Sequence, residues 1–145
     1  MKSLDLSWQS WALLSAAFAA LTAVFAKVGV AGVASDFATF VRTLVILALV
    51  TGIVLVSGQW QPPSTVSSRT WLFLILSGLA TGASWLCYFR ALKMGDAARV
   101  APIDKLSVVL VALFGVLFLG EKLSGANWAG VGLIALGAVM VAWRG

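Results

Sequence analysis

Residues 36–57 read DFATFVRTLVILALVTGIVLVS, a long apolar run in which only Asp36 and Arg42 carry charge. A helix needs roughly 20 mostly apolar residues to cross the hydrocarbon core of a bilayer. The run also lacks the strict alternation of polar and apolar residues that is typical of a half-buried strand. It therefore predicts a membrane-spanning helix.

Four further apolar runs flank this one, so we expect five spans, over residues 8–30, 36–57, 71–90, 100–119 and 128–143. Of the 145 residues 61% are hydrophobic and 10% are charged, which is far from the composition of a soluble domain. The predicted fold class is therefore all-α and integral to the membrane, with residues 1–145 as a single transmembrane domain. Segment 58–69, GQWQPPSTVSSR, is the one long extramembrane loop, because Pro62 and Pro63 prevent a helix through it.

The first span could be mistaken for a signal peptide, since its apolar run ends in small residues. Asp5 and Trp8 before that run, and four spans behind it, favour an uncleaved first helix.

The charged residues exclude several functions. The net charge is +5, but the basic residues stand singly among apolar runs and form no stripe of the kind that binds nucleic acid. The chain has no histidine and one cysteine, Cys87, so it has no catalytic triad and no credible zinc or haem site. We therefore expect neither an enzyme nor a cofactor.

The ends of the spans carry the signals of membrane orientation. With the N-terminus on side A, five tryptophans fall at side A ends, as in an interfacial aromatic belt: Trp8, Trp11, Trp60, Trp71 and Trp128. Basic residues outside the spans number about four on side B and three on side A. That near balance leaves both a single and a dual orientation open.

Four ionisable residues lie within the spans at their side B ends, namely Lys27, Arg42, Asp104 and Lys105. Charges inside a membrane are costly and normally pair or face a watery cavity. Neighbours on a helix point about 100° apart, so we expect Asp104 to pair with Arg42 or Lys27 instead of sharing a partner with Lys105. The alternative is that the long side chains extend to the headgroups, which the short Asp104 is unable to do.

The third span places Thr81, Ser84, Trp85 and Tyr88 on one helical face. Aromatic rings offer stacking and cation–π contacts while hydroxyls fix orientation, so this face suits an amphipathic organic ligand. Helix packing is the alternative use of the same residues.

Pro102 allows two interpretations, a broken or kinked fourth span and a proline tolerated in its first turn. The glycines of the third and fifth spans predict close helix packing: Gly78, Gly82, Gly130, Gly132 and Gly137.

Several motifs together resemble the EamA domain of the drug/metabolite transporter superfamily, over nearly the entire chain. They are WLCYFRALK at 85–93, Ala101-Pro102 before an apolar run, GEKLS at 120–124 and a glycine-rich last helix with Leu133-Ile134. Most members carry two such repeats in inverted orientation, whereas this chain carries one.

The resemblance implies a transporter of small organic metabolites (amino-acid-like, anionic or amphipathic compounds) in the inner membrane. One repeat provides half of a cavity, so it implies a dimer that works by alternating access, with an antiparallel homodimer favoured over a parallel dimer or a heterodimer with another half-size subunit. The expected substrate-binding residues are Trp85, Tyr88, Ser84, Thr81, Arg42 and Lys105, and Asp104 and Lys27 are the coupling or buried charges. Glu121 is expected to hold a loop or cap a helix end, and contact with the substrate is the alternative role. A non-transporting subunit or lipid-binding partner of a larger complex is the alternative.

Overall fold

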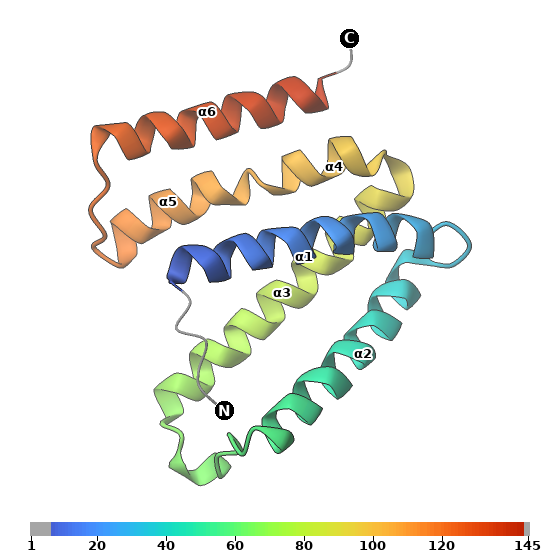
Figure 1. Cartoon of the computed structure of the whole chain (residues 1–145), viewed down its shortest axis with the longest axis vertical. Helices are drawn as coiled ribbons and strands as arrows, with labels where there is room; N and C mark the ends of the chain where they lie inside the picture. The colour runs from blue at the N-terminus through green and yellow to red at the C-terminus, as the bar shows by residue number, and fades with distance from the viewer. Residues whose placement is uncertain (1–6, 144–145) are drawn as a thin grey trace. The chain divides into compact units, whose positions relative to one another are not determined.

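The computed structural model describes residues 7–143, and within that range it is helical without strands. Its helices are α1 (Trp8–Gly29), α2 (Ser35–Val56), the 3₁₀ turn η1 (Pro63–Thr65), α3 (Ser68–Met94), α4 (Ala97–Asp104), α5 (Ser107–Phe118) and α6 (Gly125–Ala142) (Figure 1). Five stretches are long and apolar enough to cross a membrane: α1, α2, α3, α4 with α5, and α6. The prediction of an all-α, five-span fold is confirmed.

The large apolar side chains of these helices face outward, which is the opposite of a soluble protein. Phe18, Leu47 and Leu133, for example, are each more than 60% exposed. In the most apolar 18 residues of each of the five stretches, between 6 and 11% of the residues are buried inside the chain. Exposure of this kind suits lipid or another membrane chain as the surroundings of the helices.

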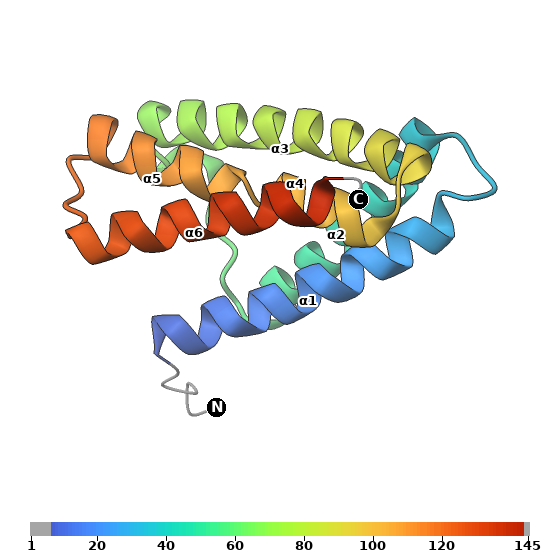
Figure 2. The ribbon, with the colours of Figure 1, turned by 90° about the horizontal axis from the view of Figure 1, so that it is seen from above.

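The chain forms two compact units, one that runs up to Lys27 and resumes at Met94, and one that comprises Val28–Lys93. In the first unit α4 and α5 follow each other along the chain and pack against α6, as both views show (Figures 1 and 2). The second unit consists mainly of α2 and α3, joined by residues 57–67.

Glycines with positive φ end two of the helices. Gly58 (φ 65°) follows α2, and the N–H of Gln59 donates to the Val54 carbonyl at 3.1 Å. Gly120 (φ 69°) follows α5, where the N–H of Glu121 donates to the Gly115 carbonyl at 3.1 Å. Both arrangements satisfy carbonyls that a helix end leaves unpaired, in a backbone conformation that only glycine adopts easily.

Glu121 of the GEKLS motif lies at this helix end, where it was expected. Its backbone closes α5, and its side chain lies against Gly115, whose missing Cβ leaves the necessary space. Ser124 of the same motif caps α6, since its hydroxyl accepts from the N–H of Asn127 at 3.2 Å. The motif therefore builds the turn between α5 and α6.

The fourth span is interrupted. Pro102 lies inside α4 and not in its first turn, and the helix stops at Asp104 before α5 starts at Ser107. Across the break the N–H groups of Leu106, Val108 and Val109 bond carbonyls three residues earlier, each at 3.0 Å, in place of the α-helical four. A proline disturbs the turn that precedes it, whereas this break follows Pro102, so the proline alone does not explain it.

Candidate functional site

Arg42 and Trp85 form the centre of a charged and aromatic cluster in the second unit. The Arg42 guanidinium carbon lies 3.9 Å from the centroid of the Trp85 ring and 5.5 Å from that of Phe89. Phe89 is buried, and Arg42 and Trp85 are half-buried. Two of the predicted binding residues are therefore brought into direct contact.

The guanidinium of Arg42 lies beside a ring that belongs to another predicted span. Arg42 is seven residues into α2, about 10 Å along the helix at 1.5 Å per residue. Trp85 lies one turn further from the end of α3 than Phe89, and the guanidinium is nearer to Trp85. The side chain therefore reaches across to a ring of α3 within the predicted span.

The other residues of the predicted face on α3 differ in their surroundings. Thr81 donates to the Ser77 carbonyl of its own helix at 2.9 Å, so its hydroxyl is engaged in a backbone contact. Ser84 is exposed and Tyr88 is half-buried. Phe89, four residues after Trp85, was missed as a ring contact of Arg42, although its i+4 spacing from Trp85 indicates that both rings lie on one side of α3.

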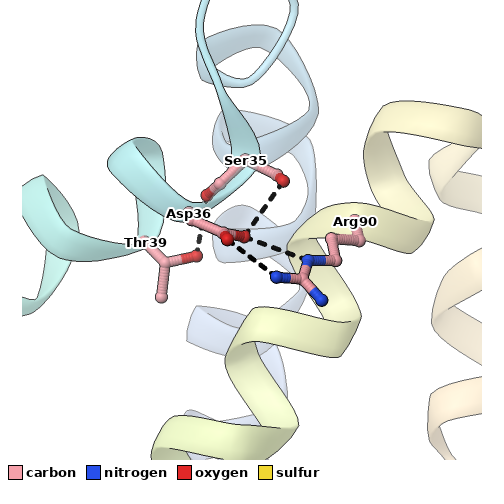
Figure 3. Close-up of polar contacts among 4 residues, drawn as sticks. All are labelled: Ser35, Asp36, Thr39 and Arg90. Atoms are coloured by element: carbon pink, nitrogen blue, oxygen red, sulfur yellow. Dashed lines mark hydrogen bonds and ion pairs between the residues drawn. The ribbon is translucent and has the colours of Figure 1, made fainter.

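Asp36 and Arg90 form a second charged contact in the same unit (Figure 3). Arg90 donates from Nε to Oδ1 at 3.0 Å and from Nη2 to Oδ2 at 2.7 Å, a two-point contact between a guanidinium and a carboxylate. Nearby, the Lys93 ammonium donates to the Val33 carbonyl at 2.7 Å. These contacts fix the start of α2 to the end of α3, and the sequence offered a signal for them, because consecutive antiparallel spans bring those two ends together.

Asp104 and Lys105 form an ion pair at the break in the fourth span, with 3.1 Å between Oδ2 and Nζ. We expected Asp104 to pair with Arg42 or Lys27, and within the first unit the structure gives its neighbour Lys105 as the partner. The argument assumed a regular helix through both residues, but α4 ends at Asp104, and the flexible lysine reaches back to its neighbour's carboxylate. Lys27, the other predicted buried charge, donates to the Gly95 carbonyl at 2.8 Å in the first unit.

The second unit offers Arg42 no carboxylate partner. Asp36 is the one acidic residue in residues 28–93, and it pairs with Arg90. Within this unit the contacts given for the Arg42 charge are with the aromatic rings of Trp85 and Phe89. A charge held in this way inside a span is suited to meet an anion.

Comparison with known proteins gives a consistent family. The EamA-like transporter family matches residues 6–143. A Sinorhizobium sp. protein named "Uncharacterized transporter in cobO 3'region" is 73% identical over 136 residues, which cover 94% of this chain and 96% of that protein. A Yersinia pestis (strain Pestoides F) protein, named as a probable 4-amino-4-deoxy-L-arabinose-phosphoundecaprenol flippase subunit ArnE, is 29% identical over 84 residues, 58% of this chain and 74% of that protein.

No solved structure matches the chain. The family match over nearly the whole length agrees with the five apolar helices, and the relatives are named as a transporter and a flippase subunit. The chain belongs to the EamA-like transporter family and is a multi-pass membrane protein.

Proposed function

We propose that this chain transports small organic metabolites across the inner membrane by alternating access in an antiparallel homodimer. The observation that carries the proposal is the interrupted fourth span with the Asp104–Lys105 pair at the break. Breaks in spans beside charged residues are typical of binding sites in secondary transporters, where the interrupted backbone lines a cavity. A span that only anchored the chain would gain nothing from either feature.

In this proposal the two charged positions have different roles. Asp104 takes up the coupling proton, which neutralises its carboxylate and releases Lys105 from the ion pair. Lys105 of the first unit is then available to the substrate. In the second unit the proposed substrate-binding residues are Arg42 and the rings of Trp85 and Tyr88, with Ser84 as a further polar contact. Alternation between the two pairing states accompanies the movement of the two copies against each other.

The glycines support a second copy as the missing half of the site. A Cβ added at Gly78, Gly82, Gly130, Gly132 or Gly137 would meet nothing within 4 Å. Small residues in spans usually mark the close approach of another helix, and a helix of a second copy is suited to these glycine faces. The nearly balanced basic residues of the two sides favour insertion of that partner in the opposite orientation.

Uptake by the protein alone tests the transport proposal. Protein purified as a single polypeptide is reconstituted into liposomes and supplied with labelled glutamate, tryptophan and 2-naphthoate. We expect saturable uptake of at least one probe, lost in Asp104→Asn and kept in Asp96→Asn, a control carboxylate just before α4. Uptake no greater than in protein-free liposomes, or equal uptake by Asp104→Asn, would overturn the proposal.

The relative named as a flippase subunit favours a second arrangement, in which this chain works with a different half-size protein. In that case the purified chain would give no uptake, and uptake would appear only after co-expression with the second subunit. A subunit without transport activity would give none in either preparation.

A further inference from the structure

We infer that the Arg42 cluster is an oxyanion site, so that the ligand of this transporter carries a carboxylate or phosphate group beside an apolar body. The inference rests on the proposed transport function, whose substrate class it specifies. Its basis is the geometry of Arg42, Trp85 and Phe89, all within the second unit.

The contact of Arg42 with the Trp85 ring involves the guanidinium charge, and the N–H donors of the same group can bind a ligand. At 3.9 Å from the Trp85 centroid the charge interacts with the face of the ring. The N–H donors of arginine lie in the guanidinium plane and form a fork that matches the two oxygens of a carboxylate or phosphate. An oxyanion can therefore bind N–H donors of Arg42 while the guanidinium keeps its contact with the Trp85 ring.

The neighbouring arginine shows this binding geometry within the same unit. Arg90 holds the two oxygens of Asp36 in a two-point contact at 3.0 and 2.7 Å. Arg42, six residues deeper into α2 than Asp36, has rings in place of a carboxylate within residues 28–93. A carboxylate or phosphate group of a ligand would bind Arg42 in the way that the Asp36 carboxylate binds Arg90.

The charge of the unit also selects against cations. Its one acidic side chain, Asp36, is already bound by Arg90, so no free carboxylate in residues 28–93 is available to a cationic ligand. No carboxylate of residues 28–93 compensates the positive charge of Arg42 inside the span, where the low dielectric makes repulsion between like charges strong. An aromatic cation is therefore rejected at the site that accepts an aromatic anion.

Equilibrium binding of three ligands of similar size tests the inference. They are 2-naphthoate, its neutral methyl ester and the cation (2-naphthylmethyl)trimethylammonium, each labelled and added to the full chain in phosphatidylcholine nanodiscs. We expect saturable binding of 2-naphthoate, at least about tenfold weaker binding of the ester and none of the cation. Equal binding of acid and ester by the unmutated protein would overturn the inference without any mutant.

Substitutions of two arginines test whether 2-naphthoate binds at Arg42. Arg42→Gln should weaken naphthoate binding at least about tenfold, and Arg42→Lys should recover part of it. Arg69→Gln is the matched control, because Arg69 also lies over a ring of α3, 6.0 Å from the Phe73 centroid near the opposite end of the helix. Naphthoate binding that is unchanged in Arg42→Gln, or lost equally in Arg69→Gln, would contradict the assignment.

Two further experiments distinguish a lipid from a solute as the source of the oxyanion, and the oxyanion-site proposal from the transport proposal. If phosphatidylglycerol in the nanodiscs competes with naphthoate in an Arg42-dependent way, a lipid headgroup supplies the oxyanion, and if it does not, a free solute supplies it. Both results support an oxyanion site. If naphthoate binds but no probe is transported, the transport proposal is wrong and the oxyanion site stands. If acid and ester are transported equally, the transport proposal stands and the oxyanion site is wrong.

Discussion

The Arg90 guanidinium binds both carboxylate oxygens of Asp36, at 3.0 and 2.7 Å, and so joins the start of α2 to the end of α3. Lys93 adds a contact to the Val33 carbonyl at the same end of the unit. Arg42 meets Trp85 deeper in the span. The second unit therefore has a stabilising ion pair near its end and an uncompensated charge within, and the following predictions separate their roles.

Loss of the Asp36–Arg90 contact should lower stability without affecting anion binding. We expect Asp36→Asn and Arg90→Gln each to lower the melting temperature in detergent, and the double variant to be no less stable than the worse single variant, because both changes remove one shared contact. Asp96→Asn, a carboxylate without a side-chain capping bond at α4, is the control. Fully additive losses in the double variant would show that the contact does not couple the two residues.

The Trp85 ring should contribute to anion binding through the cation–π contact of its face with Arg42. Trp85→Phe keeps a ring for the Arg42 charge, whereas Trp85→Leu keeps only an apolar side chain, so we expect weaker 2-naphthoate binding in Trp85→Leu than in Trp85→Phe. Trp71→Leu, at the other end of α3, should leave binding unchanged, since the Trp71 indole N–H contacts the Pro63 carbonyl in the loop. Equal binding by Trp85→Leu and Trp85→Phe would exclude a role for the ring face.

Gly120 should be required for the turn of the GEKLS motif. Gly120→Ala places a Cβ on a residue with φ of 69°, and we expect it to destabilise the protein by about 1 kcal/mol in reversible unfolding. The control is Gly52→Ala inside α2, where a Cβ meets nothing within 4 Å and helix propensity favours alanine. A Gly120→Ala protein as stable as Gly52→Ala would contradict the conformational explanation of the motif.

The break in the fourth span should depend on the charged pair as well as on the proline. In Lys105→Leu the ion pair is lost, and we expect slower hydrogen exchange at residues 104–108 as an apolar residue extends the helix through the break. Substrate uptake should fall in the same variant, because Lys105 is a proposed ligand. Unchanged exchange would show that the local sequence sets the break without the ion pair.

The sequence was sufficient for the fold because apolar length, helix-breaking prolines and glycines are local signals. The position of Arg42 inside a span predicted a functional charge, and helical spacing put Trp85 and Tyr88 on one face. The partners of the charges were less predictable. Arg90 and Asp36 are 54 positions apart, and their contact depends on how two spans pair. The Asp104–Lys105 pair was missed because it depends on the end of α4, which the sequence does not mark clearly.

Membrane orientation is the most direct test of the central claim, that one chain in two opposite orientations builds both halves of the transporter. On a Cys87→Ala background, Ser64→Cys in the long loop and Ala31→Cys in the turn between α1 and α2 are each labelled in intact cells with an impermeant maleimide, before and after permeabilisation. The account predicts that about half of the chains at each position are labelled from outside. Labelling of one position entirely from outside and of the other only after permeabilisation would contradict the antiparallel homodimer.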